Sequence, residues 1–264
     1  MKSAEKLADD ILKQDAKNRE GLICKGRLLG VQGNFEVALT TLKEAETLSK
    51  EPLEHIIGLM LIGNVYKAQQ KFSDAIASYN GSLKIANAEK NEKYIRADFN
   101  LIGNVYTQNK DLNAALTNYQ AGAKLAMNDN ERAESFEFLA ATYKALGQFD
   151  SAIEYQVKAI QMQKLAGTLD DFAESSLALG QIYVAAKDYA NADKTLIKFA
   201  QFAKDNGGAY YEAKAKLYLA QSKVARGDVE NAKLFLVDAR SLANSINAKD
   251  LNQEIEQTEK KLSN

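Results

Sequence analysis

The chain has 264 residues, with 34 lysine and arginine residues against 35 aspartate and glutamate residues, so a phosphate backbone or an anionic membrane surface is disfavoured as its partner. With one proline, no tryptophan and many strong helix formers, the composition predicts a nearly all-helical protein. No apolar run approaches the roughly 20 residues of a membrane span, and no apolar signal-peptide core follows Met1. We therefore expect a cytoplasmic protein that does not insert into membranes.

The first predicted helix covers about residues 3–14. Leu7, Ala8, Ile11 and Leu12 recur at helical spacing and define one apolar face. No partner helix precedes this segment, so residues 1–17 are expected to form half a repeat unit, either as a cap or as part of a longer array.

Six helical hairpins are expected in residues 18–246, each with a first helix, a short turn and a second helix. The hairpins occupy about residues 18–50, 51–90, 91–128, 129–167, 168–206 and 207–246. A last helix in residues 247–264 has Leu251, Ile255 and Leu262 on one side and charged residues elsewhere. That distribution predicts a terminal cap with a polar, solvent-exposed outer face.

The hairpins are recognised by a repeated sequence. Residues 61–66 and 101–106 both read Leu-Ile-Gly-Asn-Val-Tyr, 40 residues apart. Each hairpin carries one small residue in its first helix, and these residues are Gly26, Gly63, Gly103, Ala140, Gly180 and Ala220. Twelve residues after each one stands an alanine of the second helix: Ala38, Ala75, Ala115, Ala152, Ala192 and Ala232. Small residues at fixed offsets allow paired helices to approach closely, so we predict helix contacts there.

This pattern resembles the tetratricopeptide repeat family, in its longer-period variety of 37–40 residues. Ile62, Gly63 and Tyr66 match the first half of the family pattern, and Ala75 with Tyr79 matches the second. The tryptophan and closing proline of that pattern are missing. The resemblance implies an all-α, right-handed α-solenoid of six helix pairs with an N-terminal half-repeat helix and a C-terminal capping helix. The longer period is similar to that of adaptors of protein complexes and of some bacterial sensors.

Residues suited to catalysis are scarce. His55 is the single histidine and is interpreted as a surface or capping residue, and Cys24 as a small buried hydrophobe. Glu134 and Glu137 lie one helical turn apart and are interpreted as a solvated face. No phosphate-binding loop or metal-ligand spacing is present, so we expect no enzyme activity, no cofactor and no metal.

The resemblance implies that the first helices line a concave groove, with the residue after each close-packing position directed into it. Amides at four of these six positions would form a ladder able to pair with an extended peptide backbone. The predicted peptide-binding residues are Asn64, Asn104, Gln181 and Gln221 for the main chain, and Arg27, Lys67, Asn100 and Lys144 for side-chain selection. In the alternative interpretation, Asn64 and Asn104 hydrogen-bond between neighbouring first helices and fix the superhelical angle.

Two further features bear on the ligand. Leu177, Leu217, Val184 and Val224 would make the C-terminal end of the groove apolar, unless they belong to the core. A carboxylate clamp for a chaperone tail is disfavoured, because Met60 stands where the clamp needs lysine and Glu134 and Glu137 stand where it needs basic residues.

The leading functional prediction is a non-enzymatic scaffold or adaptor that binds another protein or an extended peptide in the groove, with no nucleic acid as partner. The alternative is a ligand- or peptide-sensing module of a larger bacterial signalling regulator. Self-association through the terminal helices is a further possibility, and a small hydrolase is the least favoured class.

Overall fold

The computed structural model describes residues 2–263, and side chains within 5–262. Met1 and Asn264, the outermost residues of the two expected terminal helices, lie outside the described residues. Residues up to Ala126 form one compact unit, and residues from Met127 onward form a second. The sequence analysis does not predict this division. The two units are therefore described separately.

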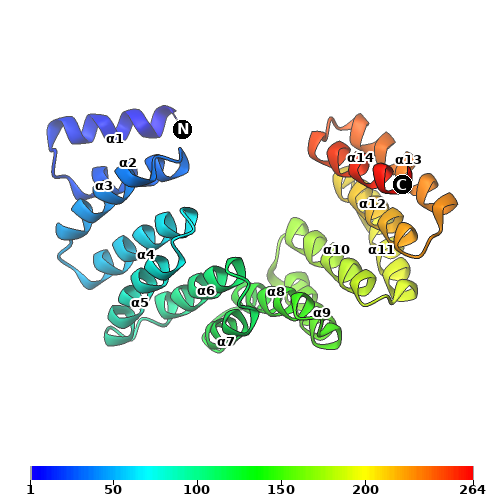
Figure 1. Ribbon diagram of the computed structural model, residues 1–264, viewed down its shortest axis with the longest axis horizontal. Coiled ribbons are helices and arrows are strands. Elements are labelled where there is room, and N and C mark those ends of the chain that lie inside the picture. Colours follow the sequence, from blue (N-terminus) through cyan, green and yellow to red (C-terminus); the bar gives the residue numbers. More distant parts are fainter. Residues whose placement is uncertain (1, 264) are drawn as a thin grey trace. The chain divides into compact units, whose positions relative to one another are not determined.

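Within residues 2–263 the chain forms helices joined by short turns (Figure 1). The first unit contains α1 (Lys2–Gln14), α2 (Arg19–Val31), α3 (Phe35–Thr47), α4 (Pro52–Ala68), α5 (Phe72–Ala88), α6 (Glu92–Gln108) and α7 (Leu112–Ala123). The second unit contains α8 (Asp129–Ala145), α9 (Phe149–Ala166), α10 (Leu169–Ala185), α11 (Tyr189–Asp205), α12 (Ala209–Ala225), α13 (Val229–Ser245) and α14 (Lys249–Ser263).

Successive helices pair as antiparallel hairpins, and each hairpin packs on the next within its unit. In the first unit α2 contacts α4 and α4 contacts α6, so these three first helices form one face. In the second unit α8, α10, α12 and α14 contact one another in the same succession. The expected all-α architecture of tetratricopeptide-like helix pairs is confirmed.

The helices of a hairpin meet at the small residues that the sequence singled out. A Cβ atom added to Gly63 would lie 2.5 Å from Cε1 of Tyr79, and one added to Gly103 would lie 2.6 Å from Cε1 of Tyr119. Gly26 meets Leu42 in the same way. The six paired alanines have no exposed surface: Ala38, Ala75, Ala115, Ala152, Ala192 and Ala232. The predicted close approach is therefore confirmed, and it leaves no room for a larger side chain.

Each hairpin turns through a residue with a left-handed backbone, placed seven positions after the close-packing residue. These residues are Gly33, Gln70, Lys110, Gly147, Lys187 and Gly227, with φ between 60° and 82°. The amide that follows each one bonds back across the last helical turn, as when Asn34 N–H donates to the carbonyl of Leu29. This geometry is a Schellman ending, which satisfies carbonyls that the helix leaves open.

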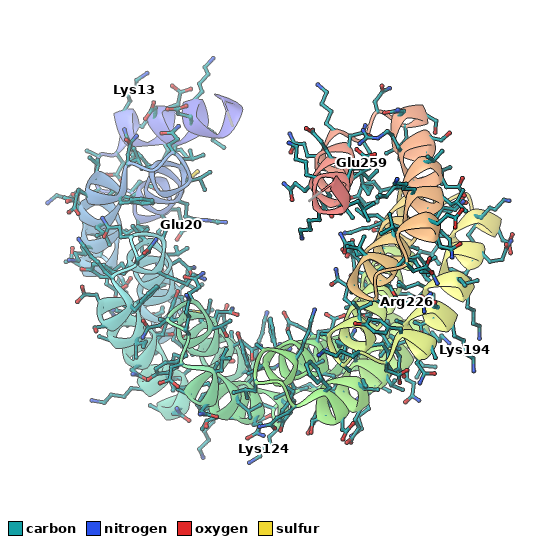
Figure 2. The ribbon with its side chains drawn as sticks, turned by 45° about the vertical axis from the view of Figure 1, so that its right-hand side comes forward. Lys13, Glu20, Lys124, Lys194, Arg226 and Glu259 are labelled. Carbon is teal, nitrogen blue, oxygen red and sulfur yellow. The ribbon has the colours of Figure 1, made fainter. Side chains whose placement is uncertain are left out.

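Some helix boundaries differ from the sequence prediction. α7 ends at Ala123, before the predicted end of the third hairpin at about residue 128, because Gly122 weakens its last turn and the side chain of Asn128 already caps α8 through the N–H of Glu131. The last helix, α14, begins at Lys249 and buries Leu251 and Ile255 against α12 and α13. Glu259 of α14, labelled in Figure 2, pairs with Arg240 of α13 at 2.6 Å.

Candidate functional site

Two of the predicted amides are held by a buried tyrosine of their own hairpin. The hydroxyl of Tyr79 on α5 donates to Oδ1 of Asn64 on α4, at 2.7 Å. Forty residues later, Tyr119 on α7 donates to Oδ1 of Asn104 on α6, also at 2.7 Å. Both tyrosines are almost fully buried, and burial raises the pKa of both hydroxyls. Each hydroxyl therefore stays protonated and acts as a fixed donor.

This hydrogen bond determines which group of the asparagine side chain remains available to a ligand. With Oδ1 engaged by the tyrosine, the Nδ2 group of Asn64 keeps both hydrogens for another acceptor. The hydroxyl can reach the amide because Gly63 and Gly103 admit the aromatic rings beside the helix backbone. The asparagine thus presents a donor of fixed orientation on the face formed by α2, α4 and α6.

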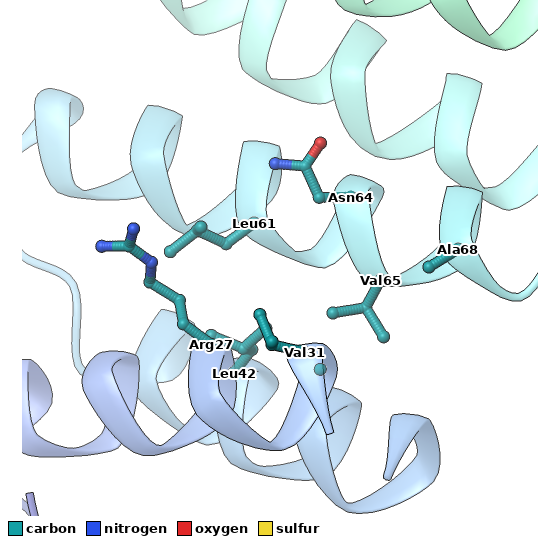
Figure 3. A pocket seen from close by; sticks show the side chains of 8 residues that line it. Arg27, Val31, Leu42, Leu61, Asn64, Val65 and Ala68 are labelled. Carbon is teal, nitrogen blue, oxygen red and sulfur yellow. The ribbon is translucent and has the colours of Figure 1, made fainter. Parts of the chain in front are cut away.

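A pocket of about 400 Å³ lies between α2 and α4 (Figure 3). Its walls are mainly apolar, whereas Arg27 and Asn64 supply polar groups at its edge. The lining comprises Arg27, Gly30 and Val31 from α2, Leu42 from α3, and Leu61, Asn64, Val65 and Ala68 from α4. Val31 is 75 % exposed, a large fraction for an aliphatic side chain. The structure therefore brings two predicted site residues, Arg27 and Asn64, to one apolar hollow, which we call the α2–α4 pocket.

Lys67 and Lys144 occupy equivalent positions in their hairpins, four residues after the close-packing residue. Both side chains are half-buried, and desolvation lowers the pKa of each ammonium group. Neither makes a hydrogen bond or ion pair with any part of the chain that the structure describes. Other largely buried cations do have carboxylate partners: Arg19 has Glu54, Lys214 has Glu174, and Lys223 has Asp193.

Asn100, a further predicted site residue, is buried and only 8 % exposed. Its Oδ1 atom lies against Gly122 of α7, 2.6 Å from where a Cβ atom of that residue would be. Because the carboxamide points into the hairpin, Asn100 packs α6 against α7 and is not part of the α2–α4–α6 face.

In the second unit the equivalent amides lie between neighbouring first helices. Gln181 on α10 lies beside the hydroxyl of Tyr218 on α12. Gln221 on α12 donates from Nε2 to Oγ1 of Thr258 on α14, at 3.3 Å. Asn64 and Asn104, to which the alternative interpretation applied, bond tyrosines of their own hairpins, so a bond between neighbouring first helices is found at Gln221 and not at these asparagines. The predicted apolar groove end is wrong at Leu177 and Leu217, because both leucines are fully buried core residues.

Acidic residues collect on α8 and at the start of α10 in the second unit. A polar hollow of about 480 Å³ is lined by Asn130, Glu131, Glu134, Glu137, Gln163 and Asp171. Glu137 accepts hydrogen bonds from Ser175 Oγ and from Gln163 Nε2. This partly buried carboxylate therefore joins α8, α9 and α10 in addition to lining the hollow.

The remaining candidate side chains serve contacts between hairpins. His55, in the first turn of α4, lies 2.6 Å from a carboxylate oxygen of Glu46 on α3. Cys24 is partly buried and forms no disulfide. In residues 2–263 no group of three or more His, Cys, Asp or Glu side chains is arranged to hold a metal ion. No helix in the described part of the chain is long and apolar enough to cross a membrane.

The sequence analysis did not identify one buried carboxylate, that of Asp98. Asp98 on α6 has no exposed surface, and its Oδ2 accepts a 2.7 Å hydrogen bond from Ser82 on α5. Its Oδ1 accepts no hydrogen bond from the described residues. Desolvation raises the pKa of Asp98 to about 7, and its charge in turn raises the pKa of Tyr79. Sequence analysis also missed the tyrosine–asparagine bonds, although the same 15-residue separation in two hairpins carried the signal.

Comparison with known proteins agrees with this fold. The family model described as Tetratricopeptide repeat matches residues 133–164, which cover most of α8 and α9. Among curated proteins, none matches the sequence. The solved structures compared below are under 25 % identical to this chain, so they bear on the fold alone.

Three of those structures illustrate the likeness. A STAND signal-transduction ATPase with a tetratricopeptide repeat sensor, from Pyrococcus horikoshii, has a TM-score of 0.74 and 18 % identity over 92 % of this chain and 38 % of its own. BtubC from P. vanneervenii has a TM-score of 0.66 and 16 % identity over 81 % of this chain and 90 % of its own. A Rap protein complexed with competence and sporulation factor has a TM-score of 0.59 and 16 % identity over 97 % of this chain and 80 % of its own.

Proposed function

This chain is a tetratricopeptide-repeat protein, and we propose that the α2–α4–α6 face of its first unit binds an extended segment of another protein. The proposed role is recognition without catalysis, as in a scaffold or adaptor. Repeat proteins of this kind use such faces of stacked helices as binding surfaces.

The observation that carries the proposal is the pair of oriented amides. Asn64 and Asn104 occupy the same position in successive hairpins, and a tyrosine holds the oxygen of each. An extended peptide has main-chain carbonyls on both edges and needs donors at regular intervals. Two asparagine Nδ2 groups fixed in advance meet that need at low entropic cost, because neither side chain must be ordered on binding.

Not every predicted site residue supports this role equally. Arg27, Lys67, Asn64 and Asn104 belong to the proposed surface in the first unit. Gln181 and Gln221 are engaged between helices, and Asn100 is buried, so we leave these three out of it. Lys144 remains a prediction for the second unit.

The experiment compares two double variants. Segments bound by the full chain are selected from a displayed library of random 12-residue peptides, and affinities are measured by fluorescence polarisation. Asn64→Ala with Asn104→Ala should weaken binding about tenfold or more, since each replacement removes a hydrogen bond to the ligand main chain. Gln181→Ala with Gln221→Ala is the matched control and should leave affinity unchanged. Equal affinity of the asparagine variant and the parent chain, with helicity intact by circular dichroism, would refute the proposal.

A second candidate function is the sensor module of a larger signalling regulator. The fold likeness to a STAND protein with a tetratricopeptide repeat sensor favours it, and this chain spans 38 % of that protein. In this case too the α2–α4–α6 face would hold the ligand. The gene sequence on both sides of the segment distinguishes the two roles, because a sensor module requires an output domain in the same chain.

A further inference from the structure

The α2–α4 pocket contains features that specify a ligand more closely than an extended main chain does. Its walls are the aliphatic side chains of Val31, Leu61 and Val65, and its volume is about 400 Å³. Ligand pockets of proteins span roughly 300–1,000 Å³, so this hollow has room for an apolar side chain of a ligand. Val31 is 75 % exposed, and it lies on the α2 side of the hollow (Figure 3). An apolar group seated in the pocket would cover it.

One cation lines the apolar hollow, and a second lies on the same helix as the pocket residue Asn64. Arg27 lies at the pocket edge and is exposed, with no ion pair to the described residues. Lys67 lies on α4, three residues after Asn64, so the two side chains are neighbours on the helix surface. No carboxylate of the described chain reaches Lys67 either.

Lys67 and its equivalent Lys144 are half-buried without a carboxylate partner, in contrast to the more deeply buried cations of the molecule. Arg19, Lys214 and Lys223 are also largely removed from water, and each is compensated by a carboxylate. Burying a cation without an anion costs free energy, and a carboxylate supplied from outside would recover that cost. The charge that the pocket edge lacks is therefore negative.

We propose that the α2–α4 pocket takes an aliphatic side chain of the bound segment, and that Arg27 and Lys67 pair with carboxylates within two residues of it. The ligand is then an acidic peptide with an aliphatic anchor. This inference rests on the proposed function, because it assigns side-chain specificity to the same face whose asparagines bind the main chain. Asn64 links the pocket to Lys67, because it lines the pocket and lies three residues before Lys67 on α4.

The test uses peptides selected on the full chain and a charge-neutral analogue of each, with Asn for Asp and Gln for Glu. Selected peptides should be enriched in Asp or Glu beside Leu, Ile or Val. The variant Arg27→Gln with Lys67→Met should bind the acidic peptide about tenfold more weakly, since charged hydrogen bonds are lost. It should bind the neutral analogue as the parent chain does. Lys194→Met is the control, at an exposed lysine of α11 to which no binding role is assigned, and should not change either affinity.

The outcomes separate this inference from the proposed function. If peptides bind through Asn64 and Asn104 without any preference for acidic residues, the acidic-peptide inference is overturned and the proposed function stands. An equal loss of affinity for acidic and neutral peptides in the Arg27→Gln, Lys67→Met variant also overturns it. If no peptide is enriched, or if Asn64→Ala with Asn104→Ala has no effect, the proposed function fails and the inference fails with it.

Discussion

The buried hydroxyl of Tyr79 donates a 2.7 Å hydrogen bond to Oδ1 of Asn64, and the same bond recurs between Tyr119 and Asn104. A core residue of the second helix thereby orients a surface amide of the first. The close approach of the ring to Gly63 is what makes this bond possible. The packing of Tyr79 inside the hairpin therefore sets the orientation of the Asn64 amide that we propose binds the ligand.

We expect Tyr79→Phe to weaken peptide binding although Tyr79 is buried and would not touch the ligand. Loss of the hydroxyl frees Asn64 to rotate, and it should lower the free energy of unfolding by about 1 kcal/mol. Chemical denaturation and fluorescence polarisation measure the two effects. Tyr106→Phe is the control, because the Tyr106 hydroxyl bonds no residue in the described part of the chain. A Tyr79→Phe variant with parental affinity would show that the amide needs no orientation.

Gly63→Ala should destabilise the first unit. The new Cβ would lie 2.5 Å from the ring of Tyr79, which is fully buried and cannot swing aside. Overpacking of this kind costs about 1–3 kcal/mol, more than alanine gains by its helix propensity.

Gly81→Ala on α5 is the matched control for that variant. Its Cβ would meet Leu59 at an ordinary 3.4 Å, so the helix propensity of alanine should raise stability by up to about 1 kcal/mol. Denaturant midpoints of the two variants should therefore move in opposite directions. A shift of both midpoints in the same direction would contradict the close-packing role of Gly63.

The left-handed turn residues predict a second pair of opposite effects. Lys110 has φ of 63° and Gly147 has φ of 73° at equivalent turns. Lys110→Gly should raise the free energy of unfolding by about 1 kcal/mol, because glycine adopts this conformation without steric cost. Gly147→Ala should lower it by a similar amount. No atom lies within 4 Å of a Cβ at Gly147, so the loss would be purely conformational. Thermal melts of both variants check the signs.

Asp98 should make stability fall as pH rises from about 4 to about 7. In this window the unfolded chain has released the proton of Asp98, whereas the folded chain retains it because burial raises its pKa from 3.8 to about 7. Folding therefore takes up a proton, and the stabilisation is complete below pH 4 and lost above pH 7. The slope should approach about 1.4 kcal/mol for each pH unit.

Asp98→Asn removes this titration and is measured by urea denaturation at a series of pH values. The variant should be more stable than the parent chain at pH 8 and should lose the slope between pH 4 and 7. Carboxylates with a lowered pKa in the folded chain, such as Glu54 and Asp171, stabilise the fold when they are ionised. Their contribution to stability is lost only as the pH falls below about 4. A parental slope that persists in Asp98→Asn would assign the dependence to other groups.

The sequence by itself determined the helix pairs and their contacts. Small residues at a fixed offset leave only one way for two short-linked helices to pack, so Gly63 and Ala75 indicated the close approach that the structure contains. The amphipathic spacing of Leu251 and Ile255 likewise indicated the buried face of the last helix. These features are local or repeat at a constant period, which is why a single sequence reveals them.

Only the tertiary structure decided what the amides do. Asn64 and Gln221 hold the same position in their repeats, yet one bonds a tyrosine of its own hairpin and the other bonds Thr258 on the next first helix. The burial of Asn100, Leu217 and Asp98 and the α2–α4 pocket also depend on neighbouring helices. Periodicity gives the position of a side chain on its own helix, whereas its hydrogen-bond partner is set by the residues that other helices bring within reach.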